Sequence, residues 1–556
     1  MPWNRILTVR RKVPVAIAKR DSGTPLSIPG PRSYFIKDLD APLLRLSRSD
    51  VFTCRQACSG VHIFGQIGSG KTSGPGRMLA GGYLRAGMGG LVTAVQPSEV
   101  RLWCDEYAPR HGRASSIVLF DESQGFNFLA YEIARQGMDG VGTVVECLMR
   151  VLEAAKRASA TASQHGGDAF WEDASRNALR YTLPVLYSAT GSLSIPDIIR
   201  FISTAPASVQ DTRDRAWQQR SFMYEVMDRA VRFPKVWMSN AALQNAINFW
   251  AEQWPAIPDK TRGNIVITIT ATLDRFNHGR LNHAFCGKTT IVPEMSFHGA
   301  VIVLAMPTLS WNEDGIIAQQ LFKFFWQRAV LNRNSLEQKH RERLVFLWAD
   351  EAQETGNSYD GEFLSMCRQS KCCVTYLTQS LPNYYSKMGG DNPRDAAQTL
   401  VGKFTTHVYC ANACPETNDY ASRMIGKVLT RRGNFSGGTS RSVSVGMNAG
   451  ANENRGWSSN SGSTFGNQSY SINSSSGSSG GSGSSWGVNR GRGTTQNTSR
   501  GYSESMEYLV EPGDFARILQ TGGPENGNIV SGVWFRSGQV FKETGRNVLL
   551  ARFKQQ

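Results

Sequence analysis

Residues 65–72 have the types and spacing that bind a nucleoside triphosphate. They read GQIGSGKT, a complete G-x-x-x-x-G-K-[ST] element, and the apolar residues 61–64 precede them. In such a loop the glycines let successive backbone N–H groups turn toward the β- and γ-phosphates. The lysine adds positive charge there, and the final hydroxyl, that of Thr72, is a ligand for Mg²⁺. We therefore expect ATP and Mg²⁺ as cofactors. The residues expected to bind the nucleotide are Gly65, Gly68, Ser69, Gly70, Lys71 and Thr72.

The second half of the expected site follows another apolar run, residues 344–349, which ends in Asp350 and Glu351. A short continuous apolar run is typical of a buried parallel strand. At its carboxyl end Asp350 would bind Mg²⁺, and Glu351 would orient and deprotonate the attacking water. Acids after a strand are also ordinary loop residues, and it is the phosphate loop upstream that favours the catalytic interpretation.

A third apolar run, residues 373–378, leads to Gln379. Its side-chain amide is expected to contact the γ-phosphate from a neighbouring strand. A glutamine at the end of a strand is often only a polar terminus, so this assignment depends on its position after the acidic pair.

The elements that must hold these residues alternate between strand and helix. After the phosphate loop the pattern predicts a helix over 78–85 and strands over 89–95 and 116–121, and a further core strand at 300–305. This alternation is typical of an α/β fold with a parallel sheet and helices on both faces. The phosphate site then lies at the carboxyl ends of the strands.

A mainly helical region interrupts the sheet. Apolar residues recur at helical spacing from Phe170 to Val185, Asp168 can cap that helix, and Ser194 with Asp197 indicates another helix start. We predict six segments: an N-terminal extension (1–50), a nucleotide-binding domain in two parts (51–130 and 256–431), an inserted all-α domain (131–255), a Gly/Ser/Asn-rich flexible linker (432–503) and a C-terminal segment returning to the nucleotide-binding domain (504–556).

The linker prediction comes from composition. The stretch is rich in Gly, Ser and Asn with scattered Arg and a few aromatic residues. Such a sequence buries too little apolar surface to offset its ordering entropy, so we expect a flexible tether. Its Arg and aromatic residues would also suit contact with single-stranded nucleic acid.

Charge and cysteine content narrow the class of protein. The 556 residues carry a formal net charge of +16, which indicates a polyanionic partner such as DNA or an anionic membrane surface, or simply solvated basic faces. No run of apolar residues reaches membrane-spanning length, so we expect a cytoplasmic protein, or one peripheral at the inner face of the bacterial membrane. The ten cysteines show no zinc spacing and are expected to be reduced.

Taken together, these motifs resemble a known family. The phosphate loop, the Phe-Trp-Glu triplet at 170–172, the Thr-Arg-Gly triplet at 261–263, the acidic pair and the run from Thr378 to Thr417 resemble the type IV secretion coupling proteins. These are TraG/TraD-type conjugative DNA-transfer ATPases, related to the FtsK and HerA motors. The resemblance covers roughly residues 55–430 and 505–550.

The resemblance implies a RecA-like P-loop motor domain with an inserted all-α domain, assembled as a hexamer around a channel that passes DNA. It also implies an Arg from the neighbouring subunit that completes the site, and Arg368, in the helix expected after the acidic pair, stands where the family has it. A helix arginine at the surface is the alternative.

The chain departs from the family in two respects. Family members usually begin with membrane-spanning helices, and no such segment is expected here, which points to a separate membrane partner, peripheral binding or a different translocation system. The family's Asp-Pro-Lys after the second strand is Gln96-Pro97-Ser98 in this chain. A DNA or phosphate contact by that lysine is therefore not expected.

The sequence thus predicts a DNA-stimulated ATPase that moves DNA or a relaxase–DNA complex toward a secretion channel. Its expected partners are sequence-independent DNA, a relaxase or relaxosome, channel proteins and copies of itself. Two alternatives stay open: a cytoplasmic HerA/FtsK-like DNA translocase or packaging motor, and a recruitment adaptor switched by nucleotide. Slow ATP turnover that does not depend on DNA would favour the adaptor. The complete set of site residues argues against the adaptor.

Overall fold

The computed structural model describes residues 35–158, 168–357, 359–388, 392–447, 454–466, 469–481 and 488–555. Most of the N-terminal extension predicted at 1–50 lies outside the described residues. The chain divides into two compact units, Met1–Thr417 with Ile518–Gln556, and Asn418–Arg517. Across the described ranges, no helix combines the length and the apolar character needed to cross a membrane.

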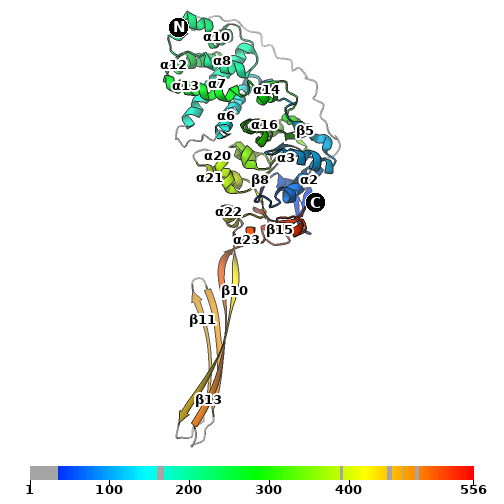
Figure 1. Ribbon diagram of the computed structural model, residues 1–556, viewed down its shortest axis with the longest axis vertical. Coiled ribbons are helices and arrows are strands. Elements are labelled where there is room, and N and C mark those ends of the chain that lie inside the picture. The colour runs from blue at the N-terminus through cyan, green and yellow to red at the C-terminus, as the bar shows by residue number, and fades with distance from the viewer. Residues whose placement is uncertain are drawn as a thin grey trace. The chain divides into compact units, whose positions relative to one another are not determined.

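The first unit contains a nine-stranded sheet in the order β15-β14-β9-β3-β8-β7-β4-β6-β5, parts of which are labelled in Figure 1. The seven strands from β9 to β5 are parallel, and β14 and β15 add an antiparallel edge. The strands are β3 (Val61–Phe64), β4 (Gly89–Thr93), β5 (Ile117–Phe120), β6 (Val301–Leu304), β7 (Val345–Ala349), β8 (Cys372–Thr378), β9 (Thr406–Tyr409), β14 (Ile529–Arg536) and β15 (Val548–Lys554).

The central strands are buried along their whole length because helices cover the sheet. On one face α2 (Arg77–Arg85) and the helical segment Leu102–Tyr107 pack into the core, where the Trp103 ring lies 5.5 Å from that of Trp348. Helix α16 (Glu313–Asn332) is largely buried, with the Phe322 ring 5.0 Å from that of Phe120 in β5. The α/β class with an inserted helical region, expected from the sequence, is confirmed.

Every regular element described between β5 and β6 is helical, and Figure 1 shows most of these helices gathered beyond α14 and α16. The Ser194 side chain accepts from the N–H of Asp197 and caps α8 as expected. The main helices are α5 (Phe128–Gln136), α6 (Gly140–Ala158), α7 (Asp168–Thr190), α8 (Ile195–Ser203), α10 (Phe222–Arg232), α11 (Asn240–Asn248), α13 (Asp259–Asp274) and α14 (Gly279–Cys286).

Helices continue past residue 255, where the sequence was expected to lead back into the sheet. Helix α13 is rich in β-branched residues, which favour strands. Its threonine hydroxyls, those of Thr268, Thr270 and Thr272, donate to the carbonyls four residues earlier and so find partners inside the helix. Local propensity is thus overridden by the surrounding helices.

The second unit differs from the flexible linker that the sequence predicts at 432–503. Its strands are β10 (Lys427–Met447), β11 (Asn454–Gly466), β12 (Ser469–Gly481) and β13 (Val488–Tyr508), in the antiparallel order β10-β13-β12-β11. The pairing of β10 with β13 runs without interruption from Lys427–Tyr508 to Met447–Val488. Composition argues against an apolar core, but a continuous backbone ladder satisfies peptide groups without one.

Candidate nucleotide site

The phosphate loop is fastened to the two strands beside β3. The N–H of Gly65 donates to Thr378 O at the end of β8 (3.2 Å), and the N–H of Gln66 donates to Ala411 O beyond β9 (3.0 Å). Gly68 and Gly70 have positive φ angles of 75° and 81°, which glycine adopts readily. The loop therefore has the left-handed turns that aim backbone N–H groups inward.

Lys71 and Thr72 meet the acidic pair at the carboxyl ends of β3 and β7. Lys71 Nζ donates to Glu351 Oε1 at 2.8 Å, and Thr72 Oγ1 donates to Asp350 Oδ2 at 2.8 Å. The Lys71 and Glu351 side chains are only 11% and 13% exposed. Two motifs about 280 residues apart in the chain thus form one site.

The site also fits a phosphate and a cation. Ser69 Oγ is buried and has no hydrogen-bond partner among the described residues, so its hydroxyl could donate to a phosphate oxygen in the loop. Mg²⁺ is usually bound by one or two protein oxygens together with substrate phosphates. The Thr72 hydroxyl and the Asp350 carboxylate, already in contact, are suited to that role.

The two acids differ in electrostatics. Burial raises the pKa of Asp350, against the attraction of Lys71 and the hydrogen bond from Thr72. For Glu351, burial would also raise the pKa, but Lys71 and the bonds from Gln353 and Gln379 outweigh it and the pKa is lowered. Glu351 is therefore held as a carboxylate, the form that a general base requires.

Gln379 joins this cluster as the sequence predicts, and Gln353 is a member that the sequence analysis missed. Gln379 Nε2 donates to Glu351 Oε1 at 3.1 Å, while Gln353 Nε2 donates to Oε2 at 2.9 Å. Thr378 Oγ1 in turn donates to Gln353 Oε1 at 2.6 Å. The backbone of Glu351 is left-handed, with φ 45°, a strained conformation for a residue with a side chain. Its carboxylate is thus oriented from three sides.

Glu99 is a second residue that the sequence did not indicate. It lies in α3 (Pro97–Arg101), directly after the Gln-Pro-Ser triplet at 96–98, and its Oε2 accepts from the N–H of Val95 at 2.7 Å. Burial and the nearby Asp350 charge raise the pKa of Glu99 to about 8. Because β4 lies beside β7, the end of β4 brings this third carboxyl toward the acidic pair.

Arg368 lies away from this cluster. It is exposed and occupies the turn after α19 (Tyr359–Met366), whereas the sequence predicted a helix position. Arg368 precedes β8 and Gln379 follows it, and a seven-residue strand spans roughly 20 Å. Within one chain Arg368 is thus at the opposite edge of the sheet, and a part in the reaction would require a neighbouring subunit.

The loop glycines give a testable prediction. A Cβ on Gly70 would lie 2.4 Å from Val530 Cγ2, whereas one on Gly68 would meet nothing within 4 Å. We expect Gly68→Ala to lower the free energy of unfolding by about 1–2 kcal/mol because of its left-handed backbone. Gly70→Ala should cost about 1–3 kcal/mol more, from overpacking against Val530, and should weaken nucleotide binding. Urea denaturation measures the free energy of unfolding, and titration with a fluorescent ATP analogue measures nucleotide binding. Equal losses of unfolding free energy in the two variants would contradict the contact with Val530.

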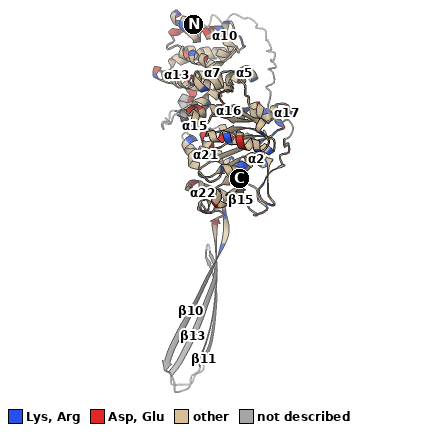
Figure 2. Ribbon diagram, turned by 45° about the vertical axis from the view of Figure 1, so that its right-hand side comes forward, with Lys and Arg blue, Asp and Glu red and all other residues tan. Residues whose placement is uncertain are grey.

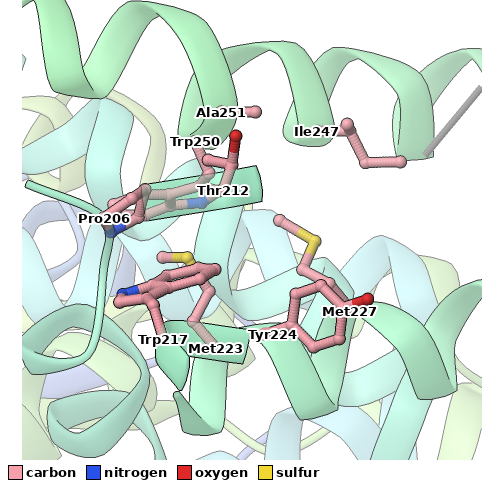
Figure 3. A pocket seen from close by; sticks show the side chains of 9 residues that line it. All are labelled: Pro206, Thr212, Trp217, Met223, Tyr224, Met227, Ile247, Trp250 and Ala251. Carbon is pink, nitrogen blue, oxygen red and sulfur yellow. The ribbon is translucent and has the colours of Figure 1, made fainter. Parts of the chain in front are cut away.

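A hollow among the helices of the insertion is a packing gap rather than a ligand site. Figure 3 shows two tryptophans, a tyrosine and two methionines converging on it. Its free space is about 20 Å³, room for about one water molecule. The side chains around it are Pro206, Thr212, Trp217, Met223, Tyr224, Met227, Ile247, Trp250 and Ala251.

Comparison with known proteins gives one family match and several structural likenesses. Residues 343–464 match the family model described as the TraM recognition site of TraD and TraG. No curated protein sequence matches the chain. The family match begins just before β7, and it includes the acidic pair and Gln379.

Among solved structures, an unbound form of the bacterial conjugative coupling protein TrwB is 14% identical, over 90% of this chain and 86% of that one, with a TM-score of 0.48. The plasmid coupling protein TrwB in complex with ADP and Mg²⁺ is 13% identical over 96% of each chain, with a TM-score of 0.49. VirB4 of Thermoanaerobacter pseudethanolicus is 12% identical over 66% of this chain and 80% of that one, with a TM-score of 0.38.

Proposed function

We propose that this protein is an ATPase that moves DNA during conjugative transfer. The proposal is supported by the match of residues 343–464 to the family model described as the TraM recognition site of TraD and TraG, which agrees with the resemblance to the type IV coupling proteins. Its cargo would be DNA or a relaxase–DNA complex, delivered toward a secretion channel. The observation that carries the proposal is the convergence of Lys71 and Thr72 on Glu351 and Asp350.

The geometry supports separate roles for the residues of the site in phosphate binding, water activation and Mg²⁺ binding. ATP would take its phosphates to Lys71 and the loop N–H groups, in competition with the Glu351 carboxylate that Lys71 now contacts. Glu351, released from Lys71 but still held by Gln353 and Gln379, would accept the proton of the attacking water. Bound Mg²⁺ would supply positive charge to the phosphates, with Thr72 and Asp350 as its protein ligands.

The proposal predicts that DNA accelerates ATP hydrolysis. A motor that grips phosphates should bind DNA of any sequence, with affinity falling steeply as salt rises, because each neutralised phosphate releases counterions. The measurement is ATP turnover with and without DNA of unrelated sequences across a salt series. Turnover indifferent to DNA at every salt concentration would contradict the motor and favour the nucleotide-switched adaptor.

Arg368 provides a test of assembly. In the proposed hexamer it would neutralise charge at the neighbour's site, since it lies too far from its own. Neither Arg368→Ala nor Glu351→Gln subunits alone should hydrolyse ATP efficiently. Rings that mix the two should recover activity at interfaces pairing an intact Glu351 with an intact Arg368. No recovery in rings shown by mass spectrometry to be mixed would leave Arg368 as a surface residue.

A further inference from the structure

Two large aromatic side chains of the helical region are exposed. Phe233 is 74% exposed and Trp237 is 71% exposed, both in the loop between α10 and α11. No other Phe or Trp whose side chain the structure describes is exposed to this extent. Tryptophan is enriched at interfaces because its ring offers a large apolar surface together with a polar N–H.

The loop that carries them is held in one conformation. The N–H groups of Lys235 and Val236 both donate to Ser188 O, at 2.8 and 3.2 Å, and Ser188 Oγ donates to Val236 O at 2.7 Å. On the other side of Trp237, the Ser239 side chain accepts from the N–H of Ala242 and caps α11. Trp237 is therefore presented by a backbone pinned at both ends, which lowers the entropy cost of using it in binding.

Trp237 forms part of a groove of about 650 Å³ between α6, α7 and α11. This volume falls within the range of about 300–1,000 Å³ usual for small-ligand sites. The groove also has the guanidinium of Arg180, the phenol of Tyr181, the amide of Asn245 and the carboxylate of Asp139 among its lining groups. Arg180, Asn245 and Asp139 are exposed to solvent.

This mixture fits a nucleotide better than an apolar peptide segment. An apolar segment lying in the groove would leave Arg180, Asn245 and Asp139 without partners, at the cost of their desolvation. A nucleotide offers a flat ring to Trp237, a phosphate to Arg180, and base donors and acceptors to Asn245 and Asp139. Basic and acidic residues are interspersed around α10 and α13 in Figure 2, so the case for a nucleotide depends on the groups that line the groove.

We propose that this groove binds an unpaired nucleotide of a single-stranded nucleic acid, with the base stacked on Trp237 and the phosphate at Arg180. The inference rests on the proposed function and adds to it a place outside the nucleotide site where the transported strand is held. DNA and RNA share the chemistry that the groove recognises, and the experiment separates them.

The experiment uses the full chain and three labelled probes: oligodeoxythymidylate, oligouridylate and a blunt DNA duplex, each titrated by fluorescence anisotropy. We expect Trp237→Ala to weaken oligodeoxythymidylate binding about tenfold, the loss of one base–aromatic stack, and Trp237→Phe to restore most of it. Arg180→Gln should weaken binding and reduce its dependence on salt. Leu309→Ala, which removes another exposed side chain (67% exposed), is the matched control and should bind like wild type.

Photocrosslinking with bromodeoxyuridine in the oligonucleotide supplies a second readout, and the adduct is expected on Trp237. Equal or tighter binding of oligouridylate, with the same loss in Trp237→Ala, would assign the groove to RNA and contradict transported DNA as its ligand. Unchanged oligonucleotide affinity in Trp237→Ala, with weakened binding of a relaxase, would mean that the groove docks a protein and would overturn the proposal.

The two proposals can fail separately. If DNA stimulates ATP turnover in wild type but Trp237→Ala binds oligodeoxythymidylate normally, the proposal for the groove is wrong. The proposal of a DNA-moving ATPase is then unaffected. If DNA never changes ATP turnover, the proposal of a DNA-moving ATPase is wrong, whatever the effect of Trp237→Ala on oligonucleotide binding. Basal ATP turnover without DNA should be the same in Trp237→Ala and wild type, since the groove lies outside the nucleotide site.

Discussion

The Glu351→Gln variant is expected to bind ATP and to hydrolyse it about 10²–10⁴-fold more slowly than the wild-type protein. The substitution keeps the shape of the side chain and can still accept from Lys71, but it removes the carboxylate whose pKa the surrounding donors lower. Lys71 and the loop N–H groups, which bind the phosphates, are unchanged. Single-turnover hydrolysis and equilibrium binding of ATP separate the two effects.

A neighbouring glutamate supplies the control. Glu354 lies on the short helix α18 (Ala352–Thr355), which begins directly after Glu351, and it pairs with Lys387 at 3.0 Å rather than with Lys71. Glu354→Gln should therefore hydrolyse ATP at close to the wild-type rate. Lys71→Ala should instead lose binding and turnover together, because a cation at the phosphates is removed. Wild-type hydrolysis by Glu351→Gln would show that another group, such as Glu99, is the base.

The sequence was sufficient for those site residues that lie in the loops at the carboxyl ends of buried strands. Lys71, Asp350, Glu351 and Gln379 could be predicted because parallel strands end at one edge of a sheet, so their positions along the chain imply their positions in space. The structure brings all four together. Their roles in binding and catalysis stay predictions until the variants are measured.

Gln353 and Glu99 could not be predicted in the same way. Gln353 acts through its contacts with Glu351 and Thr378, which depend on the left-handed backbone at Glu351. Glu99 approaches Asp350 only because β4 pairs with β7, and strand order is not readable from one sequence. The only sequence signal was the altered triplet at 96–98, directly before Glu99.

The buried network behind the site escaped sequence analysis for a related reason. The pattern of α16 predicts an apolar helix, yet Lys323 and Asp360 are both fully buried and form an ion pair of 2.8 Å. Asp360 also accepts from Gln327 Nε2 and from the N–H of Asn357. From the sequence, a lysine in an apolar helix is expected to face solvent. Only the packing of α16 against α19 gives Lys323 a buried partner.

Lys323→Met is expected to lower the free energy of unfolding by about 3–5 kcal/mol, because it leaves the Asp360 carboxylate buried without its cation. Lys339→Met is the matched control: that lysine pairs with Glu337 at the surface, where both side chains are more than 60% exposed, and its loss should cost no more than about 1 kcal/mol. Urea denaturation measures both.

Combining Lys323→Met with Asp360→Asn tests whether the charge itself is responsible. The double variant has no unpaired buried charge, so its loss of stability should be clearly smaller than the sum of the two single losses. Additive losses would mean that Lys323 and Asp360 are not coupled, and that lost packing explains each variant. Because Lys323 also donates to Thr355 O at the end of α18, a coupled pair would tie the stability of the core to the segment that carries Glu351.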